Sequence, residues 1–246
     1  MWVYCSGADS PKTQSPLKNI VLYDYQPSRA AACPKAFLQG YSGHLHVDGY
    51  AAYAHTQAKL VGCFAHARRK FIEAKSVQPK GKIGKADWAL NHFQKLYAIE
   101  KQLTNQTPEQ RYALRQEKSV PLLVHFKSWL DKSSLEVPPK SAIGGAIFYC
   151  LNQWNKLAAY VQDGHLQIDN NRAERAIKPF VIGRKNWLFS ATNRGAKASA
   201  ILYSVIETAK ANGLEPLVYV QKLLDELPRR RADDGIDDLM PWAVIG

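Results

Sequence analysis

The order of apolar and polar residues predicts a β-hairpin at the start of the chain. "MWVYCS" and "KNIVLYDY" are short runs rich in β-branched and aromatic residues, and the turn formers "GADSPKTQSP" lie between them. Two such runs separated by a turn are typical of paired strands. A short helix is expected next, over residues 29 to 39.

The stretch "GHLHVDGYAAY" predicts a third strand. Leu45 and Val47 alternate with polar neighbours, and the strand is expected to end at the turn signal Asp48-Gly49. The stretch "KLVGCFAHARRKFIEAK" then predicts a strand that runs into a helix.

Helical periodicity dominates the middle of the chain. One helical face is expected to hold Ala89, Phe93, Leu96, Tyr97 and Leu103. Thr107-Pro108-Glu109 is a helix start, and "EVPPKS" is a break. After the break, a second apolar stripe is expected to hold Ile147, Leu151, Trp154, Ala158 and Val161.

The last quarter of the chain is predicted to be helical as well. One helix is expected because apolar residues follow the i, i+3, i+4, i+7 pattern; they are Ala198, Ile201, Leu202, Val205, Ile206 and Ala209. Asn212-Gly213 ends this helix, Pro216 opens another, and Pro228 ends that one.

Composition indicates a soluble globular protein. The chain has 246 residues, of which 46% are hydrophobic and 22% are charged. No apolar run is long enough to cross a bilayer, and the first residues lack the pattern of a signal peptide. The four cysteines are widely scattered, which favours reduced thiols over a disulfide framework. A cytoplasmic protein without a membrane partner is therefore expected.

The formal net charge of +12 is concentrated in two segments. Residues 59–85 contain eight basic residues and one acid, and residues 172–197 contain seven basic residues and one acid. If the two segments meet in space, they form a site for a polyanion such as nucleic acid. The alternative is two solvated faces that never meet.

The stretch "IDNNRAERAIKPFVIGRKNWLF" places one acid, Glu174, among basic residues. Asn171 followed three residues later by Glu174 fits a helix start, with Asn171 at the N-cap and the glutamate at the positive helix end. The alternative is a metal-binding carboxylate in a phosphate-binding groove.

Asp48 is a second candidate for metal chemistry. Two carboxylates that are distant in sequence can converge on Mg²⁺, and a pair of such ions can clamp the oxygens of a phosphodiester. The alternative for Asp48 is a turn aspartate before Gly49.

Other metal-ligand residues give weaker signals. Cys63 and His66 form a C-x-x-H half-motif, but the sequence offers no second pair to complete a zinc site. For His44, His46 and His55, surface or packing roles are favoured over ligation.

Six stretches together resemble one family. They are "GHLHVDGYAAY", "VGCFAHARRKF", "LNQW", "DGHLQIDNNRAERAIKPFVIGRKNWLFS", "GAKASAILYSVIETAKANGLEP" and "DDLMPW". In this order they resemble the transposases of the bacterial insertion-sequence 66 family, which belong to the DDE class. The resemblance runs from near residue 20 to the end of the chain.

The resemblance implies an α/β fold with an RNase H-like core, a mixed sheet flanked by helices. It divides the chain into a partial core (1–76), a helical insertion (77–162), the segment of the catalytic glutamate helix (163–190) and C-terminal helices (191–246). Asp48 matches the second Asp of the family's triad, and Glu174 matches the Glu. Both are then expected to bind Mg²⁺ or Mn²⁺.

The sequence departs from the family pattern at its start. Asp9 lies in a turn-rich stretch and Asp24 in the next strand, so neither matches the first catalytic Asp. The first strand of the core and the upstream DNA-binding regions also have no counterpart. The expectation is a truncated, C-terminal portion of a transposase that is inactive alone.

The resemblance also implies partners and roles. Transposon ends and target DNA are the expected substrates, in a nucleoid-associated homo-oligomer. Phosphate is expected to be held by Arg68, Arg69, Lys70, Arg172, Arg175, Lys178, Arg184 and Lys185. One alternative is a non-catalytic DNA-binding remnant that partners an intact transposase. Another is a pseudogene product that hardly folds.

Overall fold

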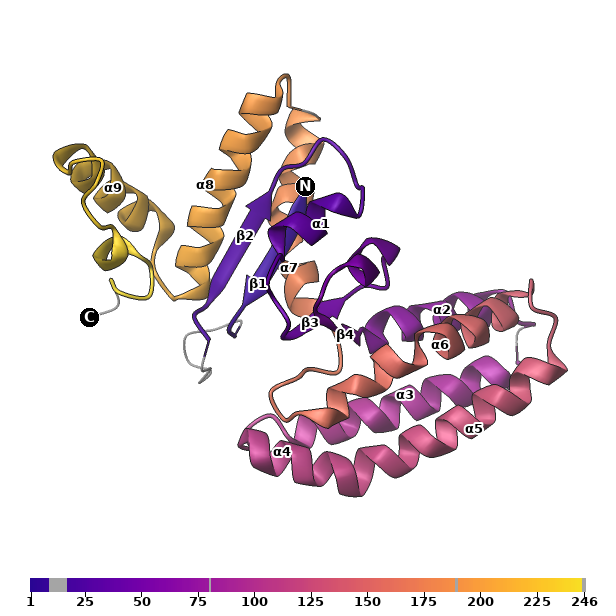
Figure 1. Cartoon of the computed structure of the whole chain (residues 1–246). Helices are drawn as coiled ribbons and strands as arrows, with labels where there is room; N and C mark the ends of the chain where they lie inside the picture. Colours follow the sequence, from indigo (N-terminus) through magenta and orange to yellow (C-terminus); the bar gives the residue numbers. More distant parts are fainter. Residues whose placement is uncertain (9–16, 80, 189, 245–246) are drawn as a thin grey trace. The chain divides into compact units, whose positions relative to one another are not determined.

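The computed structural model describes residues 1–8, 17–79, 81–188 and 190–244. The chain divides into two compact units. The central unit is Ala30–Asn170, and the terminal unit combines Met1–Arg29 with Asn171–Gly246. Each unit contains strands and helices, so the fold is mixed α/β and mostly helical, as Figure 1 shows.

The central unit begins with its strands. Helix α1 (Ala32–Phe37) leads to β3 (His44–Val47), a short 3₁₀ helix (Ala51–His55) and β4 (Lys59–Gly62). The two strands are parallel, and His46 pairs with Val61. The predicted short helix and both predicted strands are confirmed.

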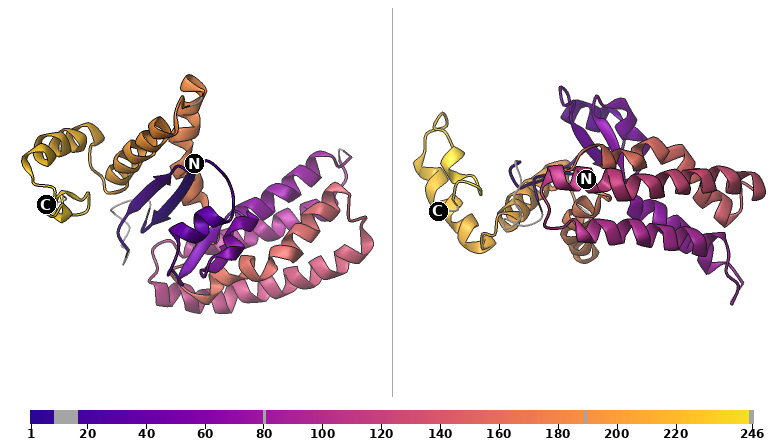
Figure 2. Two further views of the ribbon diagram at one scale, coloured as in Figure 1. Left: turned by 45° about the horizontal axis from the view of Figure 1, so that its top comes forward. Right: turned by 90° about the horizontal axis from the view of Figure 1, so that it is seen from below.

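Long helices form most of the central unit. They are α2 (Phe64–Ser76), α3 (Lys85–Gln102), α4 (Pro108–Leu114), α5 (Val120–Glu136) and α6 (Ala142–Ala158), followed by a 3₁₀ turn (Ala159–Gln162). Helices α3 and α6 each pack against both α2 and α5. Figures 1 and 2 show these four helices running side by side.

The predicted helix start at Thr107 is confirmed. Its side chain accepts a hydrogen bond from the Gln110 backbone N–H, and Gln110 Oε1 accepts one from the Thr107 backbone N–H. This reciprocal pair is the capping box that the sequence signature describes. The break at "EVPPKS" is also confirmed, because α5 ends at Glu136 and α6 begins at Ala142.

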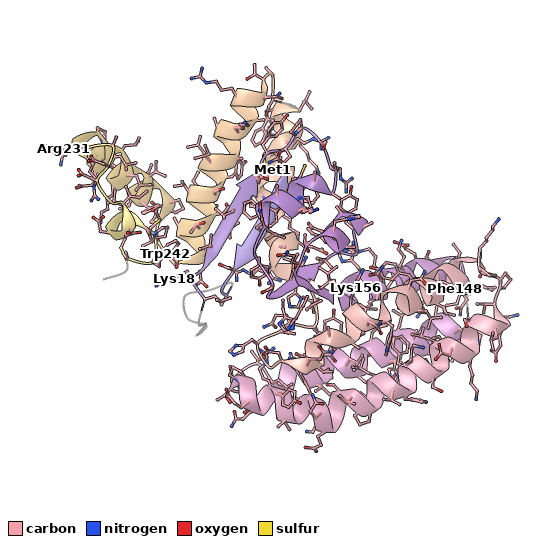
Figure 3. All side chains as sticks on the ribbon, in the orientation of Figure 1. Met1, Lys18, Phe148, Lys156, Arg231 and Trp242 are labelled. Atoms are coloured by element: carbon pink, nitrogen blue, oxygen red, sulfur yellow. The ribbon has the colours of Figure 1, made fainter. Side chains whose placement is uncertain are left out.

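The core of the central unit is a continuous apolar cluster. Phe93 of α3 lies 5.9 Å from Phe64, 5.6 Å from Phe71 and 5.2 Å from Phe126, measured between ring centroids. The predicted α3 face is confirmed, since four of its five residues are buried and Tyr97 is partly buried. On α6, where Figure 3 labels Phe148 and Lys156, the stripe prediction is confirmed in part. Ile147 is buried as predicted, but the other buried residues include Cys150 and Leu157, and the predicted members Leu151, Trp154 and Ala158 are only partly buried.

The terminal unit contains the predicted hairpin. Strands β1 (Trp2–Ser6) and β2 (Ile20–Asp24) are antiparallel, with Tyr4 opposite Leu22. Met1 and Lys18 stand at opposite ends of this hairpin in Figure 3. Residues 9–16 of the predicted turn, including Asp9, lie outside the described residues. Asp24 is the last residue of β2, as expected.

Three helices complete the terminal unit. They are α7 (Asn171–Trp187), α8 (Asn193–Ala211) and α9 (Pro216–Glu226), followed by 3₁₀ turns at Leu227–Arg229 and Asp237–Leu239. The predicted ends are confirmed, because α8 is capped by Asn212 and Gly213 has a φ of 77°. Helix α7 packs against β1, and α8 packs against β2.

Helix α8 contacts β2 through polar side chains. Thr208 Oγ1 accepts from the Val21 N–H (3.1 Å) and donates to the Val21 carbonyl (2.9 Å). One turn before and one turn after, Ser204 accepts from the Tyr23 N–H (2.8 Å) and Asn212 donates to the Asn19 carbonyl (2.8 Å). We call these three contacts the polar ladder.

The apolar stripe predicted for α8 is confirmed only in part. Ala209 is fully buried, but Ile201 and Leu202 are 64% and 57% exposed. The edge of β2 carries unpaired backbone groups, and hydroxyl and amide side chains can satisfy them while an apolar face cannot. Hydrogen bonds to β2, in addition to apolar burial, therefore fix the orientation of α8.

Aromatic rings hold α7 to the rest of the terminal unit. Tyr23, Phe180 and Tyr203 lie within 6.2 Å of one another, and Trp187 lies 6.0 Å from Tyr203, between ring centroids. A Cβ at Gly183 would come within 2.6 Å of the Trp187 ring. Gly183 is thus required for the ring of Trp187 to lie against its own helix.

The sheets are smaller than the predicted mixed sheet. The described residues form two two-stranded sheets, β1–β2 and β3–β4. The α/β class is confirmed, whereas the RNase H-like arrangement and the division into four segments stay predictions. All four cysteines are free thiols, as expected. In the described part of the chain, no helix has the length and apolar character to span a membrane.

Candidate functional site

Asp48 directly follows β3, and Cys63 directly follows β4. Since the strands are parallel and Val47 pairs with Gly62, the two residues lie at the same edge of this small sheet. Carboxyl ends of parallel strands are the usual place for functional side chains in α/β proteins. The position of Asp48 therefore fits a ligand-binding residue.

The side chain of Asp48 also shapes a turn. Its Oδ1 accepts a hydrogen bond from the Tyr50 backbone N–H at 2.9 Å, while the side chain is exposed. Gly49 has a φ of 91°, and a Cβ there would come within 2.9 Å of the Tyr149 hydroxyl. The turn reading of Asp48 is thus correct, and it leaves Oδ2 without a protein partner among the described residues.

Tyr149 of α6 was not identified from the sequence. Burial raises its pKa to about 12, with smaller effects from Cys150, Cys63 and Asp48. The phenol therefore stays protonated at neutral pH beside the Asp48-Gly49 turn.

Cys63 has a structural role in the central unit. It is buried, and its Sγ accepts a hydrogen bond from the Asn170 backbone N–H at 3.2 Å. Burial raises the pKa of this thiol. Within the described residues of this unit, Cys63 and His66 remain the half-motif seen in the sequence. The zinc interpretation gains no support here.

His46 lies two residues before Asp48 on β3. Its Nε2 accepts from the Gln167 backbone N–H at 3.3 Å, so the ring is neutral with its proton on Nδ1. Burial lowers the pKa of His46 to about 4, with smaller effects from His44 and Arg115. His46 is thus a packing residue, as favoured from the sequence.

The basic residues of α2 face solvent. Arg68, Arg69 and Lys70 are all exposed, and Lys70 Nζ lies 3.3 Å from Glu73 Oε2. Their neighbours Ala67 and Phe71 are fully buried. Helix α2 therefore presents its cations on the face opposite the core.

Glu174 lies in the first turn of α7, as predicted. The helix begins at Asn171, so the cap position falls on Asn170, one residue before the expected one. The acid at the positive end of the helix is favourable with either assignment.

The polar face of α7 combines the acid with cations. Glu174, Lys178 and Lys185 follow one another at spacings of four and seven, which places them on one stripe of the helix. Arg175, Lys178, Arg184 and Lys185 are exposed. Arg172 differs, because its guanidinium donates to the Ser6 carbonyl of β1. Arg172, one of the predicted phosphate-binding residues, is thus engaged in a hydrogen bond to the protein backbone.

The predicted site residues are divided between the two units. Asp48, Arg68, Arg69 and Lys70 belong to the central unit, and Glu174 with the other cations belongs to the terminal unit. The convergence of Asp48 and Glu174, and of the two basic segments, stays a prediction.

Comparison with known families identifies the chain. Residues 1–198 match the family described as Transposase IS66 family, and residues 204–242 match the IS66 C-terminal element. The chain belongs to the IS66 transposase family. The resemblance seen in the sequence is thereby confirmed, and the match supports a transposase function.

Three curated relatives come from Sinorhizobium fredii (strain NBRC 101917 / NGR234). Two of them, Uncharacterized protein y4hP and Uncharacterized protein y4qI, are each 32% identical to 98% of this IS66-family chain, which covers 46% of their length. Uncharacterized protein y4jD is 29% identical, and 48% of it is covered. The chain thus spans about half the length of these relatives. No solved structure matches it.

Proposed function

We propose that this chain carries part of the catalytic centre of a DDE transposase that cleaves DNA at transposon ends and transfers the strand to target DNA. Membership of the IS66 family supports this function. The observation that carries it is Asp48, an exposed carboxylate at the carboxyl end of β3 with one oxygen left over from its turn. An RNase H-like core that assembles around Asp48 and Glu174 is part of the proposal.

The donor set fits a hard divalent cation. Asp48 and Glu174 offer carboxylate oxygens, which are ligands that Mg²⁺ and Mn²⁺ prefer. A bound Mg²⁺ would polarise a phosphoryl oxygen and lower the pKa of bound water. Asp48 would hold the ion at the strand end, and Glu174 would hold it from the first turn of α7.

The exposed cations would bind the DNA backbone. The proposed phosphate contacts are Arg68, Arg69, Lys70, Arg175, Lys178, Arg184 and Lys185, with Arg172 in addition if it leaves Ser6. Cation contacts of this kind carry affinity and little sequence information, so binding should weaken steeply with salt.

Calorimetry with Mn²⁺ tests the metal site. Wild type should bind Mn²⁺, whereas Asp48→Asn and Glu174→Gln should lose most of the affinity. Asn at position 48 can still accept the Tyr50 N–H, so this variant removes charge and keeps the turn. Glu109→Gln is the matched control, because Glu109, like Glu174, is an acid in the first turn of a helix. Equal binding by all four proteins would refute the site.

Cleavage assays test the reaction. Only two carboxylates of this chain match the family's triad, so we expect weak or no strand transfer by the purified chain with Mn²⁺. Robust strand transfer would contradict that expectation. DNA binding that is unchanged in Asp48→Asn and Glu174→Gln, without metal binding or cleavage, would favour a non-catalytic DNA-binding partner of an intact transposase.

A further inference from the structure

A buried arginine organises the segment that leads to α7. Arg115 is 0% exposed and lies where α4 continues toward α5. An arginine has five N–H donors and almost never becomes fully buried without partners for them. The partners of Arg115 therefore show what the residue is for.

All five N–H donors of Arg115 have acceptors. Nε and one Nη donate to the two carboxylate oxygens of Glu100, at 2.9 and 2.6 Å. The other three N–H groups donate to backbone carbonyls of Tyr160, Asp163 and Leu166, at 2.9, 3.0 and 2.9 Å. The guanidinium also lies 5.1 Å from the centroid of the Tyr160 ring. Three of the five N–H donors of Arg115 thus form hydrogen bonds to one segment, residues 160–170.

The helix is distorted where Arg115 lies. Residues Arg115–Ser119 form a π-helical turn, and Pro121 follows shortly after. A proline lacks the N–H that would continue the regular hydrogen-bond pattern, and such wide turns are frequent at functional sites. The turn brings Arg115 to the buried side of the helix, while its neighbour Gln116 stays exposed.

Nearby side chains extend the anchor along the same segment. Gln116 Nε2 donates to the Val161 carbonyl at 2.7 Å, and the Tyr97 hydroxyl donates to Asp169 Oδ2 at 3.1 Å. Both contacts come from helices of the central unit.

The opposite side of residues 160–170 forms hydrogen bonds with residues at the ends of β3 and β4. The Gln167 N–H donates to His46, the Asn170 N–H donates to Cys63, and the Phe64 N–H donates to the Ile168 carbonyl at 3.1 Å. His46 is on β3, two residues before Asp48. The segment is thus hydrogen-bonded both to the helices and to residues at the ends of β3 and β4, and it ends at Asn170, immediately before α7.

We infer that Arg115 is a positioning residue, which with Glu100 fixes residues 160–170 against the ends of β3 and β4 and so fixes the point from which the chain enters the Glu174 helix. This inference rests on the proposed function for its consequence at the metal site. A buried ion pair is weak evidence for a gain in stability. The hydrogen bonds from Arg115 to backbone carbonyls instead determine where residues 160–170 lie.

Hydrogen exchange tests the anchor directly. Tyr97→Phe and Gln116→Ala each delete one contact and should fold, because Gln116 is exposed and phenylalanine keeps the ring of Tyr97. Losing one hydrogen bond should speed amide exchange in residues 160–170 by about threefold to tenfold, with α3 and α6 unchanged. Arg115→Lys, which has three donors for five acceptors, should show the largest effect. Gln102→Ala, an exposed glutamine of α3, is the matched control.

The same variants are then titrated with Mn²⁺. We expect the affinity of Tyr97→Phe and Gln116→Ala to fall severalfold while that of Gln102→Ala stays at the wild-type value. Exchange that is no faster than in the control would overturn the anchor. Faster exchange with unchanged Mn²⁺ affinity would overturn its positioning role and leave the proposed function intact. If wild type binds no Mn²⁺, the proposed function fails, and the exchange rates alone decide on the anchor.

Discussion

The central unit and the terminal unit of this chain are each stabilised by a different kind of core. The central unit has a continuous apolar core in which Phe64, Phe71, Phe93 and Phe126 are fully buried. The terminal unit has a small core around Val21, Tyr23 and Ala200. Many of its large apolar side chains are instead exposed, among them Val181, Ile182, Leu188, Ile201, Leu202, Leu217, Val218 and Leu224.

The difference shows what stabilises each unit. Burial of apolar surface contributes roughly 25 cal/mol per Å² and dominates where a core is large. In the terminal unit, the polar ladder and the rings around Tyr203 act together with a small apolar core. We therefore expect the terminal unit to unfold at lower urea concentration than the central unit. Trp88, Trp129 and Trp154 belong to the central unit, so their fluorescence reports the unfolding of that unit.

The largest effect is expected from a core ring of the central unit. Phe93→Ala should lower the free energy of unfolding by about 3–5 kcal/mol, since it removes a ring that touches three others and leaves a cavity. Urea denaturation measures the loss. Ile83→Ala is the control, because Ile83 is 92% exposed and should change stability by less than about 0.5 kcal/mol. Similar losses from both would mean that the core is not packed as described.

Acid should weaken the central unit through His46. Its folded pKa of about 4 lies below the unfolded value of about 6.5, so the unfolded chain takes up the proton first. The contribution is complete above pH 6.5 and is lost as pH falls toward 4. Between pH 7.5 and 4.5 we expect a loss of about 2–3 kcal/mol, measured in metal-free buffer. In His46→Gln this part of the pH dependence should disappear, and an unchanged profile would contradict the assignment.

The polar ladder should matter next. Thr208→Val keeps the shape of the side chain but leaves the N–H and C=O of Val21 unpaired, at a cost of about 1–2 kcal/mol. Thr208→Ser keeps the hydroxyl and is the matched control. Exchange of the Val21 amide should accelerate in the valine variant alone. If serine and valine are equally harmful, packing of the methyl group, and not hydrogen bonding, holds α8 to β2.

The smallest effect is expected on the outward face of α8. Ile201→Ser and Leu202→Ser should each change the free energy of unfolding by less than about 0.5 kcal/mol, because both side chains are mostly exposed. A loss above about 1.5 kcal/mol in urea denaturation would show that the apolar face predicted from the sequence is packed after all.

Local patterns predicted the elements but not their cross-links. The hairpin, β3, β4 and the cap at Thr107 follow from residues close together in sequence, and all were predicted correctly. The orientation of α8 depends on Val21, which lies 187 residues from Thr208. No periodicity within a helix contains that information.

The candidate site was predictable to a similar extent. Asp48 and Glu174 were placed correctly at a strand end and in a first helical turn, because turn and cap signals are local. Arg115 was missed, since a cation on a helix is usually solvated and nothing nearby indicates burial. Its carbonyl partners lie 45 to 51 residues away. A long-range network of this kind has no local signature.

The spacings of α8 and β2 differ, and the difference limits how long an edge one helix can cover. Four helical residues advance by about 6.0 Å, and two strand residues by about 6.6–6.8 Å. The contacts of Ser204, Thr208 and Asn212 therefore drift by about 0.7 Å per step, and a fourth contact would be out of register by about 2 Å, too far for a normal hydrogen bond. A straight helix can protect an edge about five residues long, which is the length of β2. A longer β2 would require a bent α8 or an additional strand.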